Sequence, residues 1–124
     1  MKTYLIINAV SYFGFALWCL FKPSDTANSL GYGFLNNGGK TEYLAVYSGM
    51  ELGFCAFFTL CAFYPSLSQA GLIFAVCLYV GLIIVRTITA ISLGDIPKVV
   101  YIVGALEYIL GIWGIILLYF QLKK

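Results

Sequence analysis

The sequence has little charge and no histidine. Only 10% of its 124 residues are charged and 62% are hydrophobic, whereas a typical soluble domain has about 25% charged residues. This composition excludes a disordered chain, a disulfide-stapled secreted domain and a soluble enzyme. Seven Lys and Arg residues oppose five Asp and Glu residues without forming a basic stripe, so we expect no nucleic-acid partner.

The missing histidine also narrows the possible chemistry. It removes haem ligation by His, zinc sites that need imidazole and His-based proton relays. Four cysteines lie in apolar segments without C-x-x-C spacing, at Cys19, Cys55, Cys61 and Cys77, and we interpret them as small buried hydrophobic residues. We therefore expect no metal and no cofactor. An enzyme is the least favoured class, because no nucleophile–base pair is visible.

Long apolar runs dominate the chain, at residues 3–21, 43–63, 70–93 and 99–120. Each approaches or exceeds the roughly 20 residues that cross a bilayer. We predict an all-α fold, an integral membrane bundle of four transmembrane helices in two helical hairpins, forming a single membrane domain over residues 1–124. The first run exceeds the roughly 7–15 residues of a signal-peptide core and has no small-x-small cleavage site before Lys22, so we predict a retained helix.

The links between the runs differ in length. Gly94 and Pro97 mark a tight link between the last two helices. The segment 22–42 is longer, and Ser24 with Asp25 could cap a short interfacial helix within it. This segment is then either a lid over the bundle or a plain linker lying on the lipid headgroups.

An even number of spans places both termini on one side of the membrane. Each side carries three of the lysines near the span ends (Lys2, Lys123 and Lys124 against Lys22, Lys40 and Lys98), so the positive-inside rule gives a tie. The terminal side lacks acidic residues, which slightly favours cytoplasmic termini in a multi-pass protein of a bacterial inner membrane. Tyrosines near the span ends predict an aromatic belt facing membrane lipid, at Tyr4, Tyr43, Tyr64, Tyr101 and Tyr119.

Three ionisable residues lie inside the apolar runs: Glu51, Arg86 and Glu107. Each is nine residues along its helix from a charged residue at the same membrane face. At a rise of about 1.5 Å per residue, each lies about 13 Å below that face, near the middle of a hydrocarbon core roughly 30 Å thick. We predict that the three residues form one polar layer.

Helical phase directs other polar and small residues toward the same layer. Gly104, Gly111 and Gly114 share the face of Glu107, and small residues there would allow close helix approach. Hydroxyl and amide side chains could hydrogen-bond to the charged groups. The predicted ligand- or ion-binding residues are Glu51, Arg86, Glu107, Tyr12, Asn8, Tyr47, Ser48 and Tyr79.

The charge of this layer bears on function. One arginine and two glutamates sum to minus one, so one carboxylate must be protonated, share a proton or hold a small cation. Because charged groups at mid-bilayer are costly, they mark functional sites by default. We therefore expect a protein that binds or moves a small molecule or ion in a proton-linked manner. Alternatively, the layer only locks the helices in register, in an accessory, assembly or scaffold subunit of a larger membrane complex.

The second run contains a G-x-x-x-G motif. Gly49 and Gly53 lie on one face with Ala56, roughly opposite Glu51. If Glu51 points to the bundle centre, this glycine face is left to contact a neighbouring helix at the periphery or a second copy in a homodimer.

These features together resemble a family of small four-helix bacterial membrane proteins that is known only as a domain of unknown function. The matching features are residues 42–53, Val85 with Arg86, the link 94–97 and Glu107. The likeness covers nearly the whole chain, but Ser48, Val85 and Ile96 replace glycines of the family pattern. It implies a four-helix membrane fold and singles out Arg86 and Glu107, without implying an activity.

Overall fold

The computed structural model describes residues 1–123, which are almost entirely helical. The elements are α1 (Lys2–Phe21), α2 (Pro23–Leu30), α3 (Asn37–Leu44), the π-helical segment η1 (Ala45–Met50), α4 (Glu51–Phe63), α5 (Pro65–Leu93) and α6 (Lys98–Leu122). Because α3, η1 and α4 follow one another without a break, four helical stretches are long and apolar enough to cross a membrane. The predicted all-α membrane fold is confirmed, and the chain is a multi-pass membrane protein.

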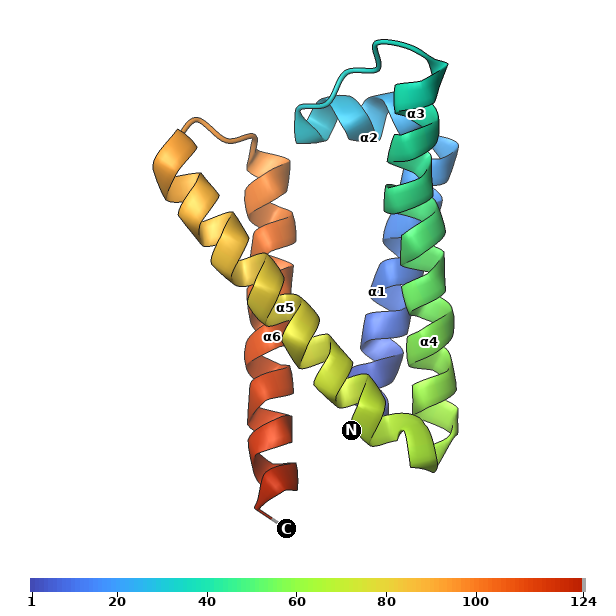
Figure 1. Ribbon diagram of the computed structural model, residues 1–124, viewed down its shortest axis with the longest axis vertical. Coiled ribbons are helices and arrows are strands. Elements are labelled where there is room, and N and C mark those ends of the chain that lie inside the picture. Colours follow the sequence, from blue (N-terminus) through green and yellow to red (C-terminus); the bar gives the residue numbers. More distant parts are fainter. Residues whose placement is uncertain (124) are drawn as a thin grey trace.

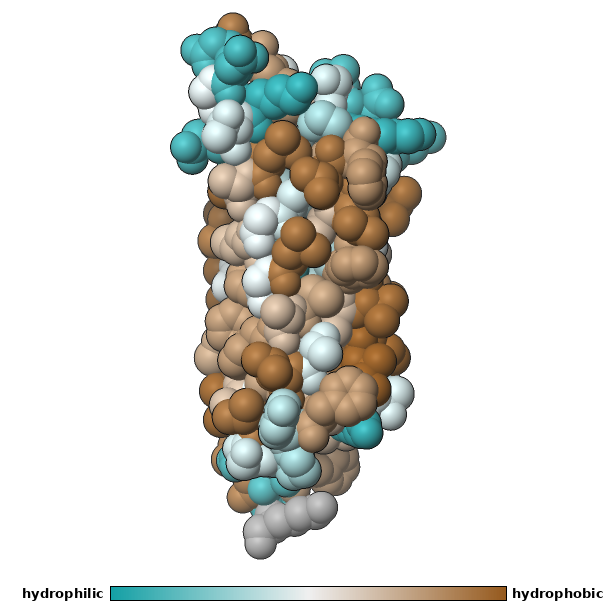
Figure 2. All heavy atoms as spheres, turned by 90° about the vertical axis from the view of Figure 1, so that its right-hand side faces the viewer, coloured by the Kyte–Doolittle hydropathy of each residue, from teal (hydrophilic) through white to brown (hydrophobic). Residues whose placement is uncertain are grey.

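The long helices form two hairpins (Figure 1). In the first, α1 packs along η1 and α4; in the second, α5 packs against α6. The start of α5 lies beside α4 and α1, whereas its second half leans away from them and crosses α6 (Figure 1). Both ends of the described chain lie at the same end of the bundle (Figure 1). Figure 2 shows one face, where a hydrophobic belt separates hydrophilic surfaces at the two ends.

Proline and glycine set the limits of α5. The helix begins at Pro65, five residues before the predicted start at 70, because proline suits the first helical position, where no backbone N–H is needed. It ends before Gly94, whose φ of 61° suits a residue without Cβ.

Helix α2 covers one end of the bundle. It lies across the ends of the long helices in Figure 1 and contacts α1, α3 and α6. The predicted caps are wrong: the helix starts at Pro23 with Lys22 as N-cap and without a capping side chain. Thr26 is fully buried under this helix and accepts a hydrogen bond of 3.1 Å from the Tyr43 hydroxyl. These contacts favour the lid over the plain linker.

Two tyrosines and one cysteine differ from expectation. Tyr4 and Tyr43 are buried in the bundle, whereas Tyr64, Tyr101 and Tyr119 are exposed as a membrane-facing belt requires. Their position near span ends could not distinguish an inward from an outward helix face. Cys77 is exposed because it lies on the outer side of α5, while Cys19 and Cys61 are buried as predicted and Cys55 is half-buried.

Glycines let α6 approach α5 and α1 closely. A Cβ at Gly111 would lie 2.9 Å from Ile83 Cδ1, and one at Gly114 would lie 3.1 Å from Tyr4 Cζ. The Tyr4 hydroxyl donates a hydrogen bond of 3.0 Å to the Leu110 carbonyl, which joins α1 to α6 across this contact. The small face predicted for α6 is therefore an internal packing face.

We expect Gly114→Ala to destabilise the protein by about 1–3 kcal/mol, the usual cost of overpacking a filled core. The new methyl would collide with the Tyr4 ring and displace its hydroxyl from Leu110. Gly53→Ala is the matched control, because a Cβ there meets nothing within 4 Å. Thermal unfolding in one detergent compares the variants, and equal melting temperatures would contradict this packing.

Candidate functional site

Arg86 and Glu107 form a bidentate ion pair between α5 and α6. Arg86 Nε donates to Glu107 Oε2 at 2.6 Å, and Arg86 Nη2 donates to Oε1 at 2.7 Å. Such paired, charge-assisted hydrogen bonds fix both distance and orientation. The side chains are 29% and 11% exposed, so the pair is largely withdrawn from the surface. Of the three residues predicted to form one polar layer, Arg86 and Glu107 are the two seen in this contact.

Gly104 makes room for this pair. It lies one turn before Glu107 on α6, and a Cβ there would be 3.0 Å from Arg86 Cδ. The absence of a side chain thus lets the arginine stem cross over α6 to reach Glu107. Arg86 has further N–H groups beyond the two that Glu107 accepts, and Nη1 makes no hydrogen bond within residues 1–123.

Glu51 lies near the pair without joining it. It is the first residue of α4, directly after η1, and is half-buried. Its carboxylate is close enough to Glu107 for the two to interact electrostatically. Within the described chain it makes no hydrogen bond and no ion pair, so Arg86 neutralises Glu107 but does not pair with Glu51.

Asn8 and Tyr79 bind each other. The Tyr79 hydroxyl donates to Asn8 Oδ1 at 2.5 Å, and Asn8 Nδ2 donates to the Tyr4 carbonyl at 2.8 Å. Both side chains are buried between α1 and α5. An apolar layer offers no water to such groups, so this chain of hydrogen bonds satisfies them internally and joins the two hairpins.

The other three predicted site residues lie along α1 and η1. Tyr12 stacks on Phe58 with ring centroids 5.7 Å apart and lies within electrostatic range of Glu51 and Glu107. The buried Ser48 donates to the Ala16 carbonyl at 3.1 Å. The Tyr47 hydroxyl is 2.8 Å from that of Tyr32, and both lie within electrostatic range of Arg86.

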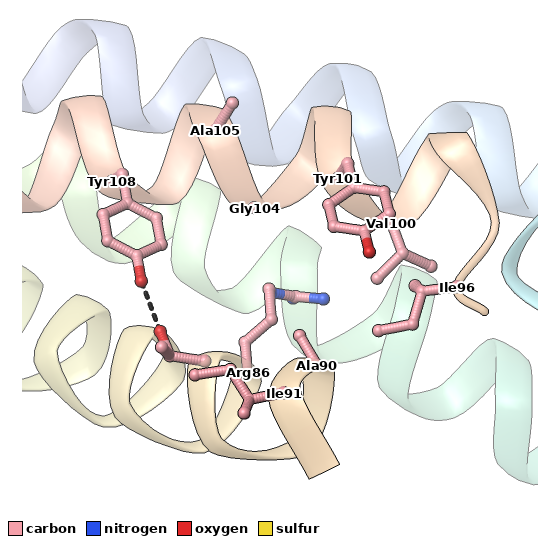
Figure 3. A pocket seen from close by; sticks show the side chains of 10 residues that line it. Arg86, Ala90, Ile91, Ile96, Val100, Tyr101, Gly104, Ala105 and Tyr108 are labelled. Atoms are coloured by element: carbon pink, nitrogen blue, oxygen red, sulfur yellow. Dashed lines mark hydrogen bonds between the residues drawn. The ribbon is translucent and has the colours of Figure 1, made fainter. Parts of the chain in front are cut away.

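A pocket of about 300 Å³ opens beside the ion pair (Figure 3). Arg86 and Gly104 line it together with Tyr101 and Tyr108. The Tyr108 hydroxyl hydrogen-bonds to Thr87, whose own hydroxyl donates to the Ile83 carbonyl. Across residues 1–123, no cluster of three or more His, Cys, Asp or Glu side chains is placed to hold a metal ion.

Sequence reasoning missed Tyr32, Thr87, Tyr101 and Tyr108. Thr87 and Tyr108 adjoin Arg86 and Glu107 in sequence, so adjacency could have pointed to them. The position of Tyr101 near a span end predicts only a place in the aromatic belt. Tyr32 carried no local signal, because its place depends on how the segment after α2 folds back onto η1.

Removing one member of the ion pair should be costly. We expect Arg86→Leu to lower the free energy of unfolding by about 3–5 kcal/mol, because Glu107 then keeps a charge without a partner. The double variant Arg86→Leu/Glu107→Leu removes both charges and should recover much of this loss. Thermal unfolding of the two single variants and the double variant forms a double-mutant cycle that isolates the pair. Simple addition of the two single losses would show that the pair contributes no coupling.

A comparison with protein families gives a match over residues 1–118 to the model described as Domain of unknown function (DUF4345). No curated protein and no solved structure gives a significant match to the chain. The matched residues include Glu51, Arg86 and Glu107, so the site lies inside the family region. This agrees with the resemblance carried by residues 42–53, Arg86 and Glu107. Because the match covers nearly the whole sequence, the chain belongs to this family, Domain of unknown function (DUF4345).

Proposed function

We propose that the protein binds a small molecule or ion at Arg86, Glu107 and Glu51, and moves it across the membrane together with a proton. One observation carries the proposal: Glu51, a second carboxylate with no hydrogen-bond or ion-pair partner within residues 1–123, lies within electrostatic range of an ion pair that is already neutral. The bidentate geometry assigns both oxygens of Glu107 to Arg86. Glu51 is therefore the group that is free to exchange a proton for a ligand.

The cost of Glu51 argues against a purely structural role. An Arg86–Glu107 pair alone would lock α5 against α6, and a nonpolar residue at position 51 would avoid placing another charge in an apolar layer. In a binding protein the same carboxylate has a use, because a proton or a bound cation can relieve its charge. Binding of one then changes the affinity for the other.

The surroundings of Glu51 support a polar binding centre. Tyr12 from α1, Tyr47 from η1 and Tyr32 from the segment after α2 bring hydroxyl groups within electrostatic range of the charged residues. The π-helical segment directly before Glu51 also fits, because such segments occur frequently at functional sites. The lid helix α2 lies over this end of the bundle (Figure 1).

Proton movement provides the first test. Proteoliposomes loaded with a pH-sensitive dye receive a membrane potential from a potassium gradient and valinomycin. We expect several-fold faster acidification than in empty liposomes, a loss of this flux in Glu51→Gln, and wild-type flux in the control Glu42→Gln at the exposed part of α3. Wild-type flux equal to that of empty liposomes, or undiminished flux in Glu51→Gln, would contradict the proposal.

We place the protein in a bacterial inner membrane, with both termini in the cytoplasm. The lysine counts of the two sides tie, and the lack of acidic residues on the terminal side favours this orientation. A lipid bilayer is then the main partner of the exposed apolar belt.

A second candidate is an accessory, assembly or scaffold role, and one observation favours it. Gly49, Gly53 and Ala56 are exposed, so no other helix of the described residues covers this glycine face. A Cβ at Gly53 would meet nothing within 4 Å. Faces of this kind let backbones of separate helices approach closely. The partner would be a second copy in a homodimer or a helix of a larger membrane complex.

The homodimer has its own test. Gly49→Leu/Gly53→Leu should convert a dimer to a monomer in mild detergent, because the leucines separate the two backbones. Gly14→Leu is the matched control, since Gly14 is also exposed with nothing within 4 Å of its Cβ, but lies on α1. Light scattering coupled to size exclusion gives the mass. A monomeric wild type, or a double variant that stays dimeric, would exclude this interface.

A further inference from the structure

We infer that the space between α5 and α6 beside Arg86, the α5–α6 wedge, binds a lipid-like molecule whose uncharged head carries a carbonyl group. This inference rests on the proposed function, because it uses the same Arg86–Glu107 pair and names the class of ligand. It also specifies the entrance, which is from the surrounding lipid and not from water.

The wedge exists because α5 and α6 separate beyond their crossing. They lean apart toward the link at residues 94–97 (Figure 1). Two pockets occupy this region, of about 300 Å³ and about 610 Å³. Arg86, Ile96 and Val100 line both of them. Arg86 is therefore reached from either pocket.

The two pockets lie on opposite sides of α5. At about 100° per residue, Thr87, Ala90 and Ile91 turn to one side of the Arg86 direction, and these residues line the smaller pocket. Gly81, Val85 and Thr89 turn to the other side and line the larger pocket. The arginine thus stands between two grooves along α5, and a branched or bent chain can occupy both.

The grooves have nonpolar walls. Arg86 is the one charged residue among those that line them, and aliphatic residues make up most of the rest. The hydroxyls of Thr87 and Thr89 already donate to backbone carbonyls of α5. The Tyr108 hydroxyl is engaged by Thr87. Such walls suit hydrocarbon chains and leave little for a sugar or an inorganic ion.

Two groups remain to bind a polar head. Arg86 Nη1 makes no hydrogen bond within the described chain, and neither does the Tyr101 hydroxyl. Both side chains line the smaller pocket, and Figure 3 shows the guanidinium directed to the part of it where Tyr101, Val100 and Ile96 lie. A carbonyl oxygen can accept from a guanidinium N–H and a phenol O–H at once.

The charge balance around Arg86 favours an uncharged polar head on the ligand. Glu107 already neutralises Arg86, so an anionic head would add a second uncompensated negative charge beside Glu51. An apolar layer disfavours such a charge. The geometry and the charge balance therefore select a neutral acceptor, such as an ester or ketone carbonyl, on a molecule with a hydrocarbon tail.

Photolabelling of the full chain in lipid nanodiscs tests the inference. The probe is a monoacylglycerol with a diazirine in its acyl chain; the comparison probe is the fatty acid with the same chain. We expect the ester probe to label α5 and α6 at the groove residues. Ala105→Trp, which fills the smaller pocket, should abolish this labelling, whereas Ala70→Trp at an exposed position near the start of α5, which lines neither pocket, should not change it.

The head contact has a matched pair of variants. Tyr101→Phe should lower labelling at a limiting probe concentration about fivefold, a factor within the range for one net hydrogen bond. Tyr119→Phe should leave it unchanged, because Tyr119 is also exposed on α6, at 53% against 57% for Tyr101, but lines neither pocket. Equal labelling in Ala105→Trp and Ala70→Trp, equal labelling in the two Phe variants, or preference for the fatty acid would each overturn the inference.

The same variants separate this inference from the proposed function. Labelling reports occupancy of the wedge, and the flux assay reports proton movement through Glu51. Specific labelling with no wild-type flux would retain the lipid-like ligand and reject transport. Flux that depends on Glu51, with no difference between Ala105→Trp and Ala70→Trp in labelling, would retain transport and reject the wedge as its ligand site.

Discussion

A pair of opposite charges between two apolar helices constrains the rest of this structure. Arg86 and Glu107 must meet, because neither can find water in the layer where it lies. Their bidentate contact fixes the rotation and axial position of α5 relative to α6, and Gly104 gives the arginine stem its space. The pair therefore helps to fix the point at which α5 and α6 cross. The α5–α6 wedge lies beyond this crossing.

The opposite half of the bundle is packed for stability. Near the chain ends, α1, α4, α5 and α6 bury a continuous core that includes Leu5, Phe58 and Leu72. Tyr4, Asn8 and Tyr79 bind one another or backbone carbonyls there, so each polar group has a partner. Toward the end covered by α2, by contrast, the Glu51 carboxylate and one Arg86 N–H group have no partner among residues 1–123. The packed core that stabilises the bundle and the polar groups without partners therefore lie in different parts of the bundle.

The sequence predicts what depends on composition and on straight helices. Apolar length predicts the four spans, and counting residues from the span ends predicts that Arg86 meets Glu107. Phase also predicts the inward turn of Gly111 and Gly114. The position of Glu51 is harder, because η1 inserts a π-helical turn that breaks the regular 3.6-residue phase directly before it. The pairing of Tyr32 with Tyr47 depends on a long-range fold that no local pattern encodes.

The two glutamates of the candidate site lie in different polar environments. Glu107 accepts two short hydrogen bonds from Arg86, so protonating Glu107 would weaken the ion pair between α5 and α6. Glu51 makes no hydrogen bond and no ion pair within the described residues, so no such contact depends on its charge. Because the two carboxylates interact electrostatically, a change at Glu51 alters the field at the ion pair beside the wedge. The site thus combines one carboxylate held in a fixed ion pair with another that has no ion-pair partner among the described residues.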